Sequence, residues 1–211
     1  MPRTTLKDGG PAAESDTRER ILHAALAIFS DQGFQGATTR AIADRAGVNL
    51  GLIKYYFDTK LRLWRAAVDR AFADLRETLT APPAPVEADN LRQQFRKRTH
   101  AFVRFAAAHP EFIRLMNDEC KREGPRMRWL VDRHVKPLYA QVSELTAQGA
   151  RTGLLPPMNP ISMYYILVGS VGLLFSQAPE CRRATGQDPM SPELIDAHAD
   201  AITHLFLGAD A

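Results

Sequence analysis

The stretch that decides the fold is residues 17–63, which read TRERILHAALAIFSDQGFQGATTRAIADRAGVNLGLIKYYFDTKLRL. Apolar residues recur there at helical spacing in three short runs, and glycines separate the runs. Gly33 is placed to give the first run a left-handed stop, and Gly47 to end the second. Two short helices that meet at Gly47 form a helix-turn-helix, so duplex DNA is the leading candidate partner.

Polar residues that precede each run predict where the helices begin. Asp16 or Thr17 is expected to cap the first helix, Thr38 or Thr39 the second, and Asn49 the third. Their side-chain oxygens accept hydrogen bonds from the free backbone N–H groups of a first helical turn. The head is therefore predicted over residues 16–63, after a flexible arm over residues 1–15 and before a second domain over residues 64–211.

The third helix of the head has two different faces. Ile53, Tyr56 and Phe57 share one face and are predicted to point inward. The opposite face suits a DNA groove, because Gly admits close approach, Lys and Tyr reach phosphate or sugar, and Leu contacts thymine methyl groups. The start of the next helix also offers free N–H groups to phosphate. The expected DNA contacts are Thr39, Arg40, Asn49, Leu50, Gly51, Lys54, Tyr55 and Lys60.

This stretch resembles the TetR family of bacterial transcription regulators. The resemblance has no gap, covers about a quarter of the chain, and is carried by Gly33-Phe34, Thr39, Ile42-Ala43, Ala46-Gly47-Val48, Gly51, Phe57, Lys60 and Leu63. It implies an all-helical homodimer that represses transcription and is usually released from its operator by a small ligand. The chain departs from the family at Lys54, where Tyr is common, and at Asn49, where Ser or Thr is common.

Composition sets limits on the partner. The chain has 211 residues, 45% of them apolar, and a formal net charge of +3, which fits an ordinary soluble protein of one or two domains. Between Thr38 and Arg62, five cations stand against two carboxylates, an excess equal to the net charge of the whole chain. A non-specific nucleoid protein needs a much larger positive excess, so sequence-specific binding is favoured.

Catalytic and metal-binding patterns are missing from the sequence. It has no glycine-rich phosphate loop, GxSxG or HExxH motif, so a helical enzyme that retains the head as a scaffold is the weaker alternative. Asp200 and His204, four residues apart, lack two further ligands, and no metal or cofactor is predicted. Cys120 and Cys181 lie far apart; buried free thiols are expected, with a redox-sensing pair as the alternative.

The N-terminus is polar. Residues 1–15 lack the apolar core of a signal peptide, so a cytoplasmic protein is expected. Arg3 and Lys7 of this arm are either solvated or placed to reach a minor groove.

The rest of the chain is predicted to be helical, which makes the fold all-α with a C-terminal helical bundle. Apolar stripes at three- and four-residue steps lie at 60–80, 91–108, 111–123, 126–151, 160–178 and from residue 191 onward. No alternating strand pattern interrupts them.

The segment 154–179 has no charged residue, and residues 161–175 are almost wholly apolar. A membrane span is one interpretation, but the segment also contains polar residues and no second span is present. We favour a helix buried on two sides, within its own subunit and against a second copy. The two final helices are expected to form a four-helix homodimer interface that includes Tyr164, Val168, Gly172, Phe175, His198, Ile202 and Phe206.

Aromatic side chains are frequent in the middle helices. They form either plain core or the lining of an apolar pocket for a small-molecule effector. The residues proposed for that pocket are Phe105, Phe112, Met116, Trp129 and Tyr165, and their size favours a hydrophobic or aromatic ligand. The complete prediction is a homodimeric regulator on a palindromic DNA operator, with no membrane partner.

Overall fold

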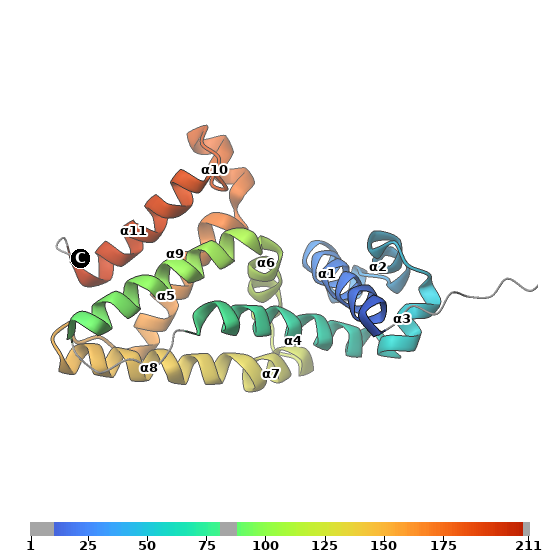
Figure 1. Cartoon of the computed structure of the whole chain (residues 1–211), viewed down its shortest axis with the longest axis horizontal. Coiled ribbons are helices and arrows are strands. Elements are labelled where there is room, and N and C mark those ends of the chain that lie inside the picture. Colours follow the sequence, from blue (N-terminus) through green and yellow to red (C-terminus); the bar gives the residue numbers. More distant parts are fainter. Residues whose placement is uncertain (1–10, 81–87, 209–211) are drawn as a thin grey trace, which may run out of the picture. The chain divides into compact units, whose positions relative to one another are not determined.

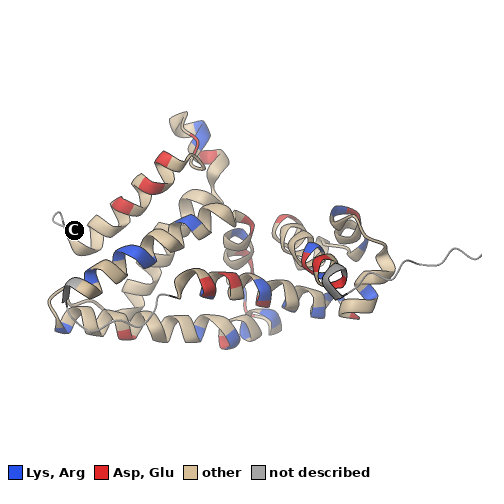
Figure 2. Cartoon of the chain, in the orientation of Figure 1, with Lys and Arg blue, Asp and Glu red and all other residues tan. Residues whose placement is uncertain are grey.

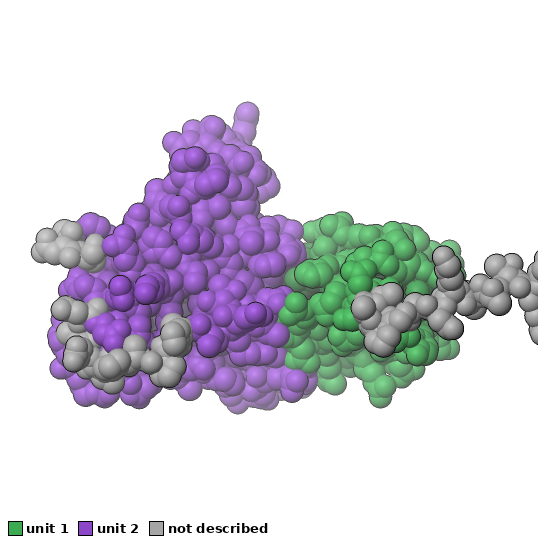
Figure 3. Space-filling view, in the orientation of Figure 1, with its two compact units in different colours: residues 1–71 green, residues 72–211 purple. Residues whose placement is uncertain are grey.

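The computed structural model describes residues 11–80 and 88–208, and every regular element in those ranges is helical, as predicted (Figure 1). The chain divides into two compact units, an N-terminal unit of residues 1–71 and a C-terminal unit of residues 72–211 (Figure 3). The division falls inside helix α4, which runs from Lys60 to Leu79. It lies eight residues beyond the predicted end of the head at residue 63.

The N-terminal unit contains α1 (Pro11–Gly36), α2 (Thr39–Ala46), α3 (Leu50–Phe57) and the first part of α4. Its core is made of apolar residues at the predicted helical spacing, among them Ile21, Leu22, Phe29, Ile42, Ile53, Phe57, Leu63 and Trp64. The small side chain of Ala43 is also buried.

The start of α1 differs from the prediction. The helix begins at Pro11, so Asp16 and Thr17 lie inside it and do not cap it. Proline is favoured at a first helical position, and the helix extends upstream of the cap-like residues from this proline. Residues 11–15 are therefore helical, whereas the remainder of the predicted arm, residues 1–10, lies outside the described residues. Gly33 has φ 68° and ψ 169° and breaks the helical geometry near its end.

The C-terminal unit holds the remaining described helices: α5 (Ala88–Ala108), α6 (Pro110–Glu119), α7 (Pro125–Leu130), the π-helix η1 (Val131–Val135), α8 (Lys136–Arg151), α9 (Pro160–Ser176), α10 (Ala178–Thr185) and α11 (Pro192–Leu207). Helix α5 packs along α11, and α9 packs against α5, α6 and α8. Prolines at the first turns of α6, α7, α9 and α11 fit positions where the missing N–H is not needed.

Opposite charges join α5 to α11. Arg104 pairs with Asp196 at 2.9 Å, and Arg96 pairs with Asp200 at 3.3 Å. Figure 2 shows Lys and Arg residues in blue on α5 and Asp and Glu residues in red on α11. The pairs are exposed and contribute little to stability, so the packing of these helices rests mainly on apolar contacts.

The predicted helix over residues 126–151 is interrupted by η1. The backbone N–H of Lys136 donates to the carbonyl of Val131, which is the spacing of a π-helix. Pro137 follows immediately and has no N–H to donate to the residue four positions earlier. The wider turn before Pro137 accommodates this missing hydrogen bond.

Two further boundaries differ from the prediction. Helix α6 ends at Glu119 rather than at residue 123. The apolar segment forms α9 and then bends by 72° into α10, which the sequence interpretation missed. Among the described helices, no single one is long and apolar enough to cross a membrane, although α9 and α10 pass that test together as a bent pair.

Candidate nucleic-acid interface and ligand region

The turn between α2 and α3 is built by the residues that the sequence indicated. Thr38 Oγ1 accepts a hydrogen bond from the N–H of Ala41 at 3.1 Å, and Asn49 Oδ1 accepts one from the N–H of Gly51 at 2.8 Å. Gly47 has φ 65° and ψ 39°, the left-handed conformation that ends α2. The two caps and the glycine turn of the helix-turn-helix are therefore confirmed.

The two faces of α3 also match the prediction. Ile53 and Phe57 are buried, and Tyr56 is half-buried. Leu50, Gly51, Lys54 and Tyr55 are all exposed, and Tyr55 has 73% of its surface accessible. An exposed face with Leu and Tyr is available to contact a partner.

Cations lie close to this face. Arg40, Arg45 and Lys54 are exposed, and within the described part of the chain none of them has an ion-pair partner. Arg62 instead pairs with Asp58 at 3.4 Å on the surface. Thr39 is half-buried. Asn49 is exposed, although its side chain accepts the hydrogen bond that caps α3. The surface of α2 and α3 thus carries three exposed cations without an ion pair to any described residue, beside one exposed carboxylate, that of Asp44.

Lys60 is placed differently from the other predicted contacts. Its Nζ donates to the backbone carbonyl of Ala37 at 3.0 Å and lies 3.5 Å from that of Gln35. The same ammonium lies 4.7 Å from the ring centre of Phe34. The side chain is half-buried and directed toward the corner between α1 and α2.

A tight turn joins α3 to α4. Asp58 has φ 61° and ψ −52°, and the N–H of Thr59 donates to the carbonyl of Phe57 at 2.6 Å across it. This is a γ-turn with positive φ, a rare and strained geometry for a residue with a side chain. Thr59 Oγ1 then accepts from the N–H of Arg62 at 3.2 Å and caps α4.

An aromatic cluster fills part of the C-terminal unit. Phe112 contacts Phe72 and Phe105 at ring distances of 5.0 and 5.6 Å. Phe72 also stacks on His134 at 4.2 Å, and Trp129 meets the same imidazole edge-on at 5.6 Å. We call these residues the aromatic cluster. It includes three of the five predicted pocket residues, Phe105, Phe112 and Trp129.

Two members of the predicted pocket do not belong to this cluster. Met116 is half-buried on α6, the helix that also carries Phe112. Tyr165 has 67% of its surface exposed on the outer face of α9, which corrects its assignment to an enclosed pocket. The sequence interpretation missed Phe72, although it follows Ala71 of the predicted apolar stripe directly.

A pocket of about 410 Å³ lies elsewhere, between α9, α10 and α11. Its lining includes Gly169, Leu173, Cys181 and His198, and His198 Nε2 is 2.8 Å from the carbonyl of Ser170. The pocket is open and lies along the exposed apolar side of α9.

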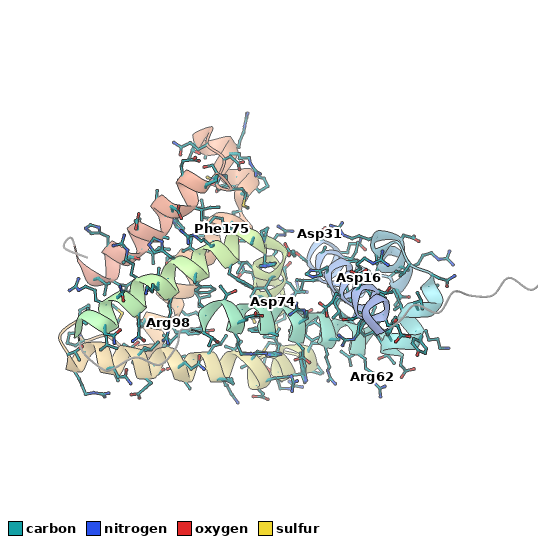
Figure 4. All side chains as sticks on the ribbon, in the orientation of Figure 1. Asp16, Asp31, Arg62, Asp74, Arg98 and Phe175 are labelled. Carbon is teal, nitrogen blue, oxygen red and sulfur yellow. The ribbon has the colours of Figure 1, made fainter. Side chains whose placement is uncertain are left out.

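The predicted homodimer residues require a correction. Gly172, Phe175, Ile202 and Phe206 are buried within the chain, so they offer almost no surface to a second copy (Figure 4 labels Phe175). Tyr164, Val168 and His198 are half-buried. The outer apolar residues are instead Ile161, Tyr165, Ile166 and Leu173 on α9 and Leu205 on α11. Both faces of α9 are apolar, so periodicity did not distinguish the inner face from the outer one.

The cysteines are also placed differently. Cys120 is exposed at the end of α6, not buried as predicted, and Cys181 is half-buried. Desolvation, with a smaller effect from the Glu119 carboxylate, raises the pKa of the Cys120 thiol. A raised pKa disfavours the reactive thiolate. Within the described ranges, no group of three metal-ligating side chains is brought together.

Comparison with known proteins gives consistent results for both units. A family model described as "Bacterial regulatory proteins, tetR family" matches residues 21–67, and one described as "Tetracyclin repressor-like, C-terminal domain" matches residues 92–205. The HTH-type transcriptional regulator RutR of Escherichia coli K12 is 28% identical over 82% of this chain and 81% of its own length. The HTH-type transcriptional repressor NicS of Pseudomonas putida is 28% identical over 93% and 92%.

A solved structure has the same fold. AibR in complex with isovaleryl coenzyme A and operator DNA aligns with a TM-score of 0.71 at 16% identity, over 91% of this chain and 98% of the other.

Proposed function

The chain belongs to the TetR family of bacterial regulatory proteins, and we propose that it is a homodimeric repressor that a small hydrophobic or aromatic effector releases from a palindromic operator. Its family consists of DNA-binding transcription regulators, so the alternative of a helical enzyme is set aside. The observation that carries the proposal is the exposed face of α3, together with the cations on α2 and α3 that have no ion-pair partner among the described residues.

In the proposed complex, α3 enters the major groove. Lys54 and Tyr55 reach phosphates, Arg40 adds a phosphate contact from α2, and Leu50 touches base edges. Gly51 permits close backbone approach, because it is exposed and has no side chain. Two copies of α3 related by a two-fold axis would read half-sites about 34 Å apart, one turn of DNA.

The homodimer is proposed to form through the outer apolar face, which we define as Ile161, Tyr165, Ile166, Leu173 and Leu205. Helix α9 has no charged residue along its length, which is unusual for a surface helix. A face of this kind marks an interaction site. Its two-fold repetition would place two heads on one palindrome.

The aromatic cluster is the proposed effector region. Arg98 shares a face of α5 with Phe105, seven residues further on (Figure 4 labels Arg98). Its Nε is buried without a hydrogen-bond partner among the described residues, as is Ser143 Oγ on α8. Such atoms are stabilised when a ligand supplies an acceptor. The AibR complex, a structure of the same fold, contains both a small molecule and operator DNA, which supports a small-molecule effector for this chain.

The test begins with selection of DNA from a randomised duplex pool by the purified protein. The expected result is an enriched palindrome whose protected half-sites are about one helical turn apart. Metabolites are then screened by thermal shift and by release of the selected duplex. The effector must bind the free protein more tightly than the DNA complex, because the coupling is reciprocal. Trp129→Ala is expected to abolish the response while leaving DNA affinity within a few-fold.

Two outcomes would contradict the proposal. Binding of all duplexes with equal affinity would indicate a non-specific DNA-binding protein. Protection of a single, non-repeated site would remove the homodimeric operator.

A further inference from the structure

Lys60 was expected to contact phosphate, but its side chain is used within the N-terminal unit. The ammonium donates to the carbonyl of Ala37 and lies 3.5 Å from that of Gln35, and it lies over the face of Phe34. Phe34 in turn stacks on Phe29 at 5.8 Å and meets Trp64 edge-on at 6.4 Å. Trp64 is fully buried in α4. Lys60 therefore joins the first turn of α4 to the corner between α1 and α2.

The chemistry of this corner suits an ammonium group. Two backbone carbonyls after the break at Gly33 supply partial negative charge, and the ring face of Phe34 supplies more. Hydrogen bonds that involve a charged donor are stronger than neutral ones. A half-buried ammonium held in this way has fewer donors free to reach a phosphate.

The acceptor that Lys60 binds lies next to the start of α2. Ala37 is buried and precedes Thr38, whose side chain caps the helix. Thr39 and Arg40, the first residues of α2, follow directly. The bond across 23 residues thus fixes the corner from which α2 begins.

We propose that Lys60 is a positioning residue for DNA binding: it joins the first turn of α4 to the corner before α2 and so sets the place of the α2 cap and of Arg40, without itself contacting phosphate. This inference rests on the proposed binding of DNA through α2 and α3. The proposal distinguishes a lysine that contacts phosphate, whose loss changes the salt dependence of DNA binding, from a positioning lysine, whose loss lowers affinity without changing that dependence.

The experiment compares Lys60→Met with Lys54→Met in the full-length protein. Both changes remove one positive charge and keep an unbranched apolar chain, and Lys54 is the exposed lysine proposed to contact phosphate. The probe is a fluorescein-labelled duplex that the wild-type protein selects from a randomised pool. Anisotropy titrations over about 50 to 200 mM salt give the affinity and its salt slope, since each lost phosphate contact lowers the slope by about 0.9.

The expected result is a different signature for each variant. In the proposed homodimer Lys54→Met removes two phosphate contacts, one from each subunit, and so lowers the steepness of the salt slope by about 1.8. Lys60→Met lowers affinity by about tenfold, from the loss of charge-assisted hydrogen bonds, but leaves the slope unchanged. Hydrogen exchange in Lys60→Met should be faster at the Ala41 amide, which depends on the Thr38 cap.

Several results would overturn the proposal. A slope that falls by about 1.8 in Lys60→Met, two contacts in the dimer, would make Lys60 a phosphate contact, and unchanged affinity would remove any role for it. If Lys60→Met does not fold, Phe34→Leu removes the aromatic face and leaves the charge. The proposal then expects weaker binding at unchanged slope, and wild-type affinity would contradict it. Failure of the wild-type protein to select any duplex would instead contradict the proposed function.

Discussion

At the scale of single residues, the turn at Asp58 holds strained backbone that the sequence did not reveal. The strain belongs to its φ of 61°, which a glycine adopts freely. Its carboxylate pairs with Arg62 only on the surface, at 3.4 Å, and such pairs contribute little. The side chain of Asp58 therefore does little to offset the strain of the turn.

We predict that Asp58→Gly stabilises the protein by about 1 kcal/mol, because relief of backbone strain exceeds the added entropy of the unfolded chain. For a chain of this size, the melting temperature should rise by about 2 to 4 °C. Asp58→Ala is the matched control, since it removes the carboxylate but keeps the Cβ that causes the strain. An equal rise in both variants would show that charge, not backbone geometry, is responsible.

Residues whose role is set locally were the ones that the sequence predicted well. Thr38, Gly47 and Asn49 act on backbone groups two to four positions away, so their neighbours alone determine what they do. The corner at Lys60 was missed because its partners lie 23 and 25 residues earlier in the chain.

At the scale of elements, α9 shows why burial is harder to predict than helicity. Asn159 caps it, and its helical character was clear from the sequence. Its inner and outer faces are both apolar, so only tertiary packing shows that Gly172 faces Ile113 while Leu173 is 55% exposed. For the same reason, the sequence did not show which aromatic residues of the C-terminal unit are buried and which are exposed.

The contact between α9 and α6 can be tested with one substitution that should destabilise the wild-type protein but stabilise a variant with a smaller side chain at residue 113. A Cβ at Gly172 would lie 2.9 Å from Ile113 Cγ2. We predict that Gly172→Ala destabilises the protein by about 1 kcal/mol, because overpacking exceeds the gain in helix propensity. In an Ile113→Ala background, the same change should stabilise by up to about 1 kcal/mol.

Urea unfolding of the four proteins at one fixed concentration measures this cycle. Independent, additive effects of the two substitutions would mean that α6 and α9 do not meet at this point.

At the scale of the whole molecule, the outer apolar face predicts the oligomeric state. Leu173→Glu places a carboxylate at a position that is exposed in a single chain, so the fold should survive. In the proposed dimer the same carboxylate would be buried without a partner, which costs several kcal/mol. We expect the dimer dissociation constant to rise by about 100-fold or more, since each 1.4 kcal/mol is tenfold.

Sedimentation velocity over a concentration series measures this change. Gln141→Glu on the exposed side of α8 adds the same charge outside the face and should remain dimeric. A dimer of wild-type strength in Leu173→Glu, or dissociation in both variants, would place the interface elsewhere.

The uncharged length of α9 has a consequence for gene dosage. If the homodimer forms as proposed, a newly made chain presents Ile161, Tyr165, Ile166 and Leu173 to water until it meets a second copy. Its encounter rate falls with the square of its concentration, whereas chaperones and proteases act on each chain singly. Scarce chains are then removed faster than they assemble, so halving the rate of synthesis should reduce the amount of mature regulator by more than half. The amount of regulator in the cell would in this way respond to its own expression as a threshold.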